Sequence, residues 1–186
     1  MTGTVAAIVW GDVPRHLAGR GREGGARGQL LFGRRPSGGV PSERMTTIPE
    51  GARRFLATGP LAHVITLDAD GSPHVSLAWA GFEGDQVVFS SFFDQRKLAN
   101  LRRDPRVTLS FQANENVDKE FLHPYLVIEG RADVTSGGAM AVMDWLAPAY
   151  LGPGARFPNR EMPDGFTIHV DVDKVYGMGN WRGARR

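Results

Sequence analysis

Cysteine is absent from this chain of 186 residues, and its five histidines are scattered along the sequence. Without cysteine, the protein has no disulfide bonds, no thiolate metal ligands and no cysteine nucleophile. A disulfide-free chain is compatible with the reducing cytoplasm, where we expect the protein to be located. No two histidines are spaced so that one helix would present both to a metal ion. We therefore expect no metal site.

Long hydrophobic runs are also missing. A helix that spans a bilayer needs about 20 apolar residues, and no stretch of this chain approaches that length. The apolar segment from Val5 to Trp10 has no basic residues before it and is followed by Asp12. This is not the pattern of a signal peptide. We expect no association with a membrane.

The charge is unevenly distributed. Residues 1–44 contain seven arginines and three acidic residues, whereas residues 45–186 contain 15 lysines and arginines and 17 acidic residues. The front segment also holds ten of the 24 glycines, so it cannot bury enough apolar surface to offset the entropy lost on ordering. It is either an arginine–glycine tail that binds nucleic acid, or a disordered extension or translated leader ahead of a start at Met45. We favour the extension, place one folded domain at residues 45–186, and expect no nucleic-acid partner.

The folded part has the pattern of a mainly β (α+β) protein. A first short helix follows Pro49, and turn residues at Asp70-Gly71 and Glu83-Gly84-Asp85 connect hairpin strands. We predict strands at 61–68, 72–82, 86–91, 106–113, 125–135 and 166–172, and further helices at 95–103 and 139–146. Strands joined by hairpins pair antiparallel. Six such strands with few helices are best accommodated by closing the sheet into a barrel, which removes exposed edges.

One stretch combines groups that suit an anion. The strand 86–91 ends in Ser90 and Ser91, Asp94 is placed to cap the next helix, and the first turn of that helix contains Arg96 and Lys97. Cations are disfavoured at a helix N-terminus because the macrodipole is positive there. They are favourable if a phosphate binds the free N–H groups at that end. The alternative is that both cations point into solvent beside a simple cap, and the residues alone leave both interpretations open.

Four segments carry a family resemblance: Gly71-Ser-Pro-His-Val-Ser76, Phe89-Ser-Ser91, Arg96-Lys97 and Asn100-Leu-Arg-Arg-Asp-Pro-Arg-Val107. They resemble the pyridoxamine-phosphate-oxidase-like, FMN-binding split barrels, and more narrowly the actinobacterial subgroup that binds the deazaflavin coenzyme F420. The resemblance extends over nearly all of residues 49–182. It implies a six-stranded antiparallel split barrel that forms a homodimer, with the cofactor at the subunit boundary.

The resemblance also implies site residues. In that family the end of the third strand and the following Arg-Lys pair hold the cofactor phosphate, while the second strand runs along the ring. The matching phosphate positions are Ser90, Ser91, Arg96 and Lys97. The matching ring positions are His74, Val75, Ser76 and Leu77.

Two departures from the family pattern narrow the chemistry. The flavin-dependent oxidases have a basic residue at each end of their second-strand motif, and the stretch Val75–Ala80 has neither. They also have an Arg-x-His motif near the C-terminus, where this chain reads Gly177-Met-Gly-Asn-Trp-Arg182. These departures argue against pyridoxamine phosphate oxidase activity and weaken FMN as the cofactor without excluding it.

Four further residues were weighed for contact with the cofactor. Gln112, on the polar side of its strand, is a candidate contact. Trp181 either covers the pocket or anchors the C-terminal segment. Trp79 and Phe82 would suit stacking on a ring, but aromatic residues on a barrel strand more often belong to the core.

The sequence therefore predicts an F420-dependent oxidoreductase that transfers a hydride between the deazaflavin and an unsaturated or quinone-like small molecule. A cofactor enzyme needs no reactive nucleophile of its own, and we assign no catalytic residue. Two alternatives remain: an FMN-dependent oxidase or flavin reductase with the same fold, and a carrier or sensor that binds F420 without turnover.

Overall fold

The computed structural model describes residues 48–113, 124–159, 161–179 and 181. These residues form three helices, α1 (Glu50–Leu56), α2 (Arg96–Arg103) and α3 (Ala139–Leu151). They also form seven strands: β1 (Ala62–Leu67), β2 (Pro73–Ala78), β3 (Ala80–Glu83), β4 (Gln86–Ser91), β5 (Arg106–Gln112), β6 (Tyr125–Ser136) and β7 (Phe166–Met178). The predicted extension 1–44 and the predicted loop 114–123 lie outside the described residues. None of the helices described is long and apolar enough to cross a membrane.

The sheet closes on itself. Its strands follow the order β2-β1-β5-β6-β7-β4-β3, and every neighbouring pair is antiparallel. The two ends of this order, β2 and β3, are separated in sequence by Trp79 alone. One chain segment therefore forms both edges and joins them covalently. The predicted mainly β split barrel is confirmed, and its six strands become seven because the strand expected at 72–82 is interrupted at Trp79.

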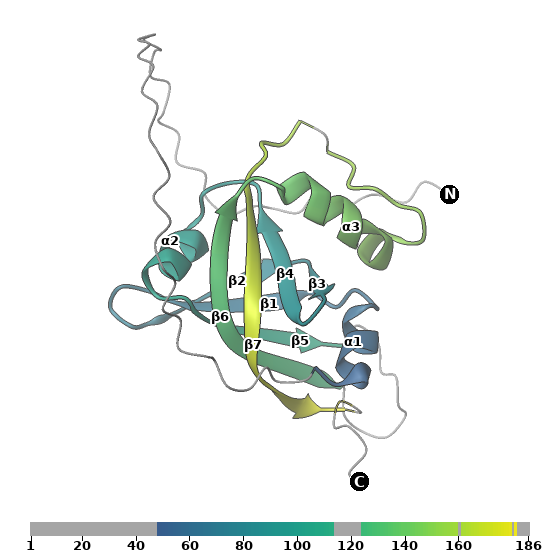
Figure 1. Ribbon diagram of the computed structural model, residues 1–186, viewed down its shortest axis with the longest axis horizontal. Coiled ribbons are helices and arrows are strands. Elements are labelled where there is room, and N and C mark those ends of the chain that lie inside the picture. The colour runs from purple at the N-terminus through teal and green to yellow at the C-terminus, as the bar shows by residue number, and fades with distance from the viewer. Residues whose placement is uncertain (1–47, 114–123, 160, 180, 182–186) are drawn as a thin grey trace, which may run out of the picture. The chain divides into compact units, whose positions relative to one another are not determined.

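Two groups of strands cross one another, as Figure 1 shows: β4, β6 and β7 run nearly upright, with β1, β2 and β5 across them. The long strand β6 pairs with β5 through its first half and with β7 along its whole length. Its register with β7 shifts between Glu129 and Gly130, which is a bulge that bends the strand. At Gly130 a Cβ would collide with the carbonyl oxygen of Asp171, so the bend requires glycine.

The core lies inside the sheet and beneath α2. Its largest fully buried side chains include Phe89, Phe111 and Leu109. The predicted inward residues of α2, Leu98 and Leu101, are buried in the same cluster. Burying each such side chain stabilises the fold by about 1.5–3 kcal/mol. This packing fixes α2 against the sheet and so fixes the position of its first turn.

Three local predictions were wrong. Asp94 does not cap α2: the helix begins after Gln95 without a side-chain cap, and Asp94 instead binds Arg102 at 2.8 Å. The last strand extends to Met178 rather than ending at 172, because it pairs with the first half of β6 as well as the second. Helix α3 continues to Leu151 rather than ending at 146, and it contains Pro148.

Candidate functional site

The first turn of α2 is positively charged and lacks a protein cap. It contains Arg96 and Lys97 and no acidic residue, and the preceding Gln95 has extended backbone angles with no side-chain hydrogen bond to the helix. Free N–H groups and the helix dipole both favour an anion at such an end. The two cations differ sharply in their surroundings.

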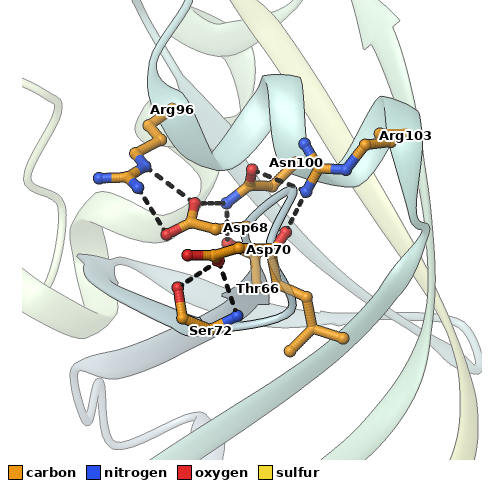
Figure 2. A network of polar contacts seen from close by, with 8 residues as sticks. Thr66, Asp68, Asp70, Ser72, Arg96, Asn100 and Arg103 are labelled. Carbon is orange, nitrogen blue, oxygen red and sulfur yellow. Dashed lines mark hydrogen bonds and ion pairs between the residues drawn. The ribbon is translucent and has the colours of Figure 1, made fainter.

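Arg96 forms a bidentate ion pair with Asp68, the residue that follows β1 (Figure 2). Its Nε and one terminal nitrogen donate to the two carboxylate oxygens at 2.8 and 2.6 Å. The Arg96 side chain is 65% exposed, whereas that of Asp68 is only 11% exposed. The guanidinium group therefore covers a carboxylate that is largely withdrawn from water.

Asn100 completes the surroundings of Asp68. Its Nδ2 donates to Asp68 Oδ1 at 2.8 Å and lies 3.1 Å from the hydroxyl of Thr66, both in the interior (Figure 2). The Asn100 hydrogen bond, together with that of Arg96, lowers the pKa of Asp68 below its ordinary value. Asp68 is therefore ionised at neutral pH, and it ties the start of α2 to the end of β1.

The neighbouring hairpin turn is closed by its own side chains. Asp70 accepts hydrogen bonds from the backbone N–H and the hydroxyl of Ser72 at 3.0 and 2.6 Å. Gly71 takes a φ of 85°, which residues with a Cβ rarely adopt. The predicted Asp70-Gly71 turn is confirmed, and it holds β2 in register beside β1.

Lys97 is buried without a partner. Only 2% of the residue is exposed, and it makes no hydrogen bond or ion pair with any of the described residues. Burial lowers the pKa of its ammonium group from 10.5 to about 8. A buried cation without a counter-charge is unfavourable, so this position favours an anionic ligand.

The serines at the end of β4 lie on opposite faces of the strand, because successive strand residues alternate. Ser91 is buried, and its hydroxyl donates to the Phe93 carbonyl at 2.8 Å, in the loop that leads into α2. Ser90 has a buried hydroxyl with no partner within the described chain. The structure thus places Ser91 beside the loop that precedes α2, and gives no contact between Ser90 and either cation.

The four predicted residues of β2 also divide between two faces. His74 and Ser76 are half-buried, and His74 Nδ1 and Ser76 Oγ are buried without a partner in the described part of the chain. Val75 and Leu77 point the other way and are 56% and 53% exposed. A ring lying along β2 would meet the apolar pair on one face, or the two polar side chains on the other.

The two remaining predicted residues lie away from α2. Gln112 is exposed at the end of β5, opposite Tyr125. Trp181 is 6% exposed, belongs to the core cluster and packs against Phe55 with ring centres 4.8 Å apart. This packing favours the interpretation of Trp181 as an anchor of the C-terminal segment.

The buried polar atoms without a partner follow a pattern. Among the described residues there are four such side-chain atoms, His74 Nδ1, Ser76 Oγ, Ser90 Oγ and Trp181 Nε1. All four belong to residues that the sequence identified as cofactor contacts. An unpartnered buried polar group costs about 1–3 kcal/mol, and such groups often indicate a missing ligand. His74, Ser76 and Ser90 therefore fit a polar ligand, and Lys97 fits an anionic group on it.

Trp79, weighed as a ring-stacking residue, packs within the protein. Its ring stacks on Tyr150 of α3 at 4.6 Å, with the planes 8° apart. The Tyr150 hydroxyl accepts from the backbone N–H of Ala80 at 2.9 Å and lies 2.8 Å from the Pro60 carbonyl. Burial raises the pKa of Tyr150 to about 12. These contacts hold the interruption between β2 and β3.

A cavity of about 300 Å³ opens elsewhere, over β1, β5, β6 and β7. Ile65, Thr108 and Glu129 are among its lining residues, and none of the ten predicted site residues lines it. The cavity nevertheless borders the predicted site, because its lining residue Ile65 pairs with Val75 of β2 and Leu67 precedes Asp68.

Asp68 and Asn100 are the site residues that the sequence interpretation missed. A signal was present, because Arg96 and Asn100 are four apart on a helix and so share one face. Asn100 is buried, and a buried amide needs a hydrogen-bond partner. The partner itself, Asp68, lies 28 residues away from Arg96 in sequence and has no local signature.

Comparisons with known proteins identify the family and the fold. The family model for pyridoxamine 5'-phosphate oxidase matches residues 48–179. A solved structure of an F420 reductase is 25% identical with a TM-score of 0.56, covering 69% of this chain and 98% of that one. A conserved hypothetical protein from Mycobacterium tuberculosis is 19% identical with a TM-score of 0.54, covering 67% and 80% of the two chains. A heme binding protein from Mycobacterium smegmatis is 20% identical with a TM-score of 0.52, and the match covers 70% of this chain and 53% of that one. No curated protein matches the sequence.

Proposed function

Because the chain belongs to the pyridoxamine 5'-phosphate oxidase family, we propose that it binds coenzyme F420 and transfers a hydride between that cofactor and an unsaturated or quinone-like small molecule. The observation that carries the proposal is the buried Lys97, which has no counter-charge in the described chain at the uncapped start of α2. The similarity to an F420 reductase at 25% identity supports the choice of cofactor.

Different residues of this chain would bind different parts of the cofactor. Lys97 and the first N–H groups of α2 would hold the phosphate, because both offer positive charge to an anion. Ser90 and Ser91 are the hydroxyl candidates, and the unpartnered Ser90 Oγ has a free hydrogen-bonding capacity to offer. The polar side chains of His74 and Ser76, likewise unpartnered, would take the polar edge of the ring.

The bound deazaflavin would supply two-electron hydride chemistry, and the protein would orient the ring and exclude water from it. Donors that face the developing charge on a ring are more effective in a buried site than in water. Ser76 Oγ and His74 Nδ1 have that degree of burial. We therefore propose that these two side chains position the ring rather than react covalently.

A second copy of the chain would complete the site. Val75 and Leu77 share one face of the sheet with Tyr125, Tyr176 and Met178, as the strand register requires, and all five are at least 40% exposed. Exposed apolar residues that share one face can mark an interaction surface, and here β1 and β5 lie between the residues of β2 and those of β6 and β7. We propose that this face pairs in a homodimer and that the cofactor lies at its edge.

The test is a titration of the full chain with F420 and with FMN, followed by fluorescence, in wild type and in Arg96→Ala/Lys97→Ala. We expect wild type to bind F420 and the double variant to lose most of that affinity. The control is Arg54→Ala/Arg156→Ala, which removes two exposed cations, one on α1 and one in the loop after α3, and should leave binding unchanged. If the Arg96/Lys97 variant binds both cofactors as well as wild type does, the phosphate assignment is wrong.

Turnover separates the enzyme from its alternatives. Reduced F420 should be oxidised when the protein is supplied with members of a panel of enones and quinones. Tight F420 binding with no oxidation by any acceptor would indicate a carrier or sensor. A purified protein with a flavin absorption envelope would indicate FMN.

A further inference from the structure

The start of α2 holds one cation that the protein neutralises and one that it does not. Arg96 is bound by Asp68 through two hydrogen bonds of 2.8 and 2.6 Å. Farther along the helix, Arg102 is bound by Asp94, and Arg103 donates to the Leu67 carbonyl and to Asn100. Of the cations of α2, Lys97 alone has no such partner among the described residues.

Asp68 is held in place by hydrogen bonds from two residues of α2. Its carboxylate accepts from Arg96 and from Asn100, and Asn100 is itself 97% buried, with a further contact to Thr66 (Figure 2). The pair of Asp68 and Arg96 has no net charge. An anion at the start of the helix therefore meets one cation without a partner among the described residues, Lys97, next in sequence to Arg96, which holds the Asp68 carboxylate at the same helix start.

The two candidate cofactors differ in the charge of their phosphate. The phosphate of F420 is a diester and carries one negative charge. That of FMN is a monoester, which carries between one and a half and two charges at about neutral pH because its second pKa is about 6. A site with one free cation matches the diester, and a carboxylate beside it penalises the second charge of the monoester.

Building on the proposed function, we infer that Asp68 determines the selectivity of the site between singly and doubly charged phosphates. By holding Arg96, it leaves only Lys97 for the ligand. Removing the carboxylate while keeping the shape would release Arg96, so that two cations would become available.

The opposing interpretation is that Arg96 leaves Asp68 when a phosphate arrives and binds the ligand directly. Asp68 would then be a structural anchor without influence on selectivity. The two interpretations make different predictions for a pair of substitutions, because one depends on net charge and the other on the Arg96 side chain itself.

The test uses Asp68→Asn, Arg96→Gln and the double variant in the full chain. Each is titrated with F420, FMN and riboflavin, the last of which lacks a phosphate. We expect Asp68→Asn to strengthen FMN binding about tenfold, to strengthen F420 binding less, and to leave riboflavin unchanged; tenfold corresponds to about 1.4 kcal/mol. Arg96→Gln should weaken FMN more than F420.

The double variant decides between the interpretations. It has the net charge of wild type, so the ratio of FMN to F420 affinity should return to the wild-type value. If the ratio instead stays as low as in Arg96→Gln, Arg96 binds the phosphate directly and the inference is overturned. An Asp68→Asn variant with an unchanged ratio would also overturn it, since thermal unfolding of each variant establishes that the chain is folded.

Failure of the proposed function has a different signature. If wild type binds neither cofactor, the proposed function fails, and the selectivity is measured with phenyl phosphate and methyl phenyl phosphate, a monoester and a diester, by phosphorus NMR. A change in the preference between these esters in Asp68→Asn would support the inference even then. An unchanged preference would reject it.

Discussion

The starts of α2 and α3 both leave backbone N–H groups without partners inside the helix, and the two starts differ in the groups that surround them. At the start of α3, the side chain of Asp164 accepts from the Gly138 N–H at 3.0 Å, and its backbone carbonyl accepts from the Ala139 N–H at 2.9 Å. The N–H of Ala139, the first residue of that helix, and that of the preceding Gly138 are thus satisfied by Asp164, although no side chain caps α3 either. At the start of α2 no side chain caps the helix, and two cations occupy the first turn.

The far end of α3 is also tied by protein groups. The Tyr150 hydroxyl contacts the Ala80 N–H and the carbonyls of Ala80 and Pro60, and its ring stacks on Trp79. The comparison teaches that this fold can satisfy a helix end internally when nothing needs to bind there. The two starts therefore differ in charge, because the first turn of α2 holds Arg96 and Lys97 and the first turn of α3 holds no charged residue.

The largest effect should come from Lys97→Met, which removes the unpartnered charge and keeps an unbranched side chain. We expect affinity for F420 to fall by about tenfold to a hundredfold, since a hydrogen bond to a charged group contributes about 1.5–3 kcal/mol. Fluorescence titration measures this loss. Arg54→Met, on the exposed side of α1, is the control and should bind as wild type does. If both variants bound F420 equally well, Lys97 would not contribute to binding, and the difference between the two helix starts would have no functional meaning.

The same variant should be more stable than wild type in the absence of ligand, by up to about 3 kcal/mol near neutral pH. The pKa of Lys97 is about 8 in the folded state against an ordinary 10.5. Between these values the unfolded chain binds the proton and the folded chain does not, so the stability of wild type rises with pH through this window. The advantage of Lys97→Met should therefore shrink as the pH rises from about 7 to about 10. Denaturant unfolding of both proteins across that range measures it, and a constant difference would contradict the prediction.

The sequence predicted the helix, strand and turn of the site better than the side-chain contacts between them. The hairpin at Asp70-Gly71, the strand 86–91 and the cationic helix start are all local patterns, and each is where the sequence placed it. The pairing of Arg96 with Asp68 spans 28 residues and depends on how α2 packs on the sheet. Periodicity cannot supply such a contact, because it describes one element at a time.

The faces of β2 illustrate the same limit. His74, Val75, Ser76 and Leu77 were identified together from a family motif, yet strand alternation divides them into two half-buried and two exposed residues. The interruption at Trp79 was hidden because the apolar pattern continues through it. It is created by Tyr150 of α3, which hydrogen-bonds Ala80 from 70 residues away.

A third prediction concerns the contacts that Tyr150 makes at the far end of α3. Tyr150→Phe keeps the stacked ring and removes the hydroxyl, leaving the Ala80 N–H and two carbonyls without their partner. We expect a loss of about 2 kcal/mol in the free energy of unfolding and no change in F420 affinity. Ser136→Ala, which removes an exposed hydroxyl at the end of β6, is the control and should change neither quantity. A drop in affinity in Tyr150→Phe would mean that the two regions are not independent.

The smallest effect should come from Asp164→Ala, which removes the side-chain acceptor at the start of α3. Loss of such a bond costs about 1 kcal/mol, and the backbone bond from the Ala139 N–H to the Asp164 carbonyl remains. Chemical denaturation should show this small loss, with F420 affinity unchanged. Asp164→Ala thus lowers stability without affecting binding, whereas Lys97→Met raises stability and lowers binding. Opposite signs are expected because a cap shaped by the fold stabilises the folded chain, while a buried, unpaired cation destabilises it until an anion binds. If both variants lowered stability, Lys97 would be a structural residue and the two helix starts would not differ in purpose.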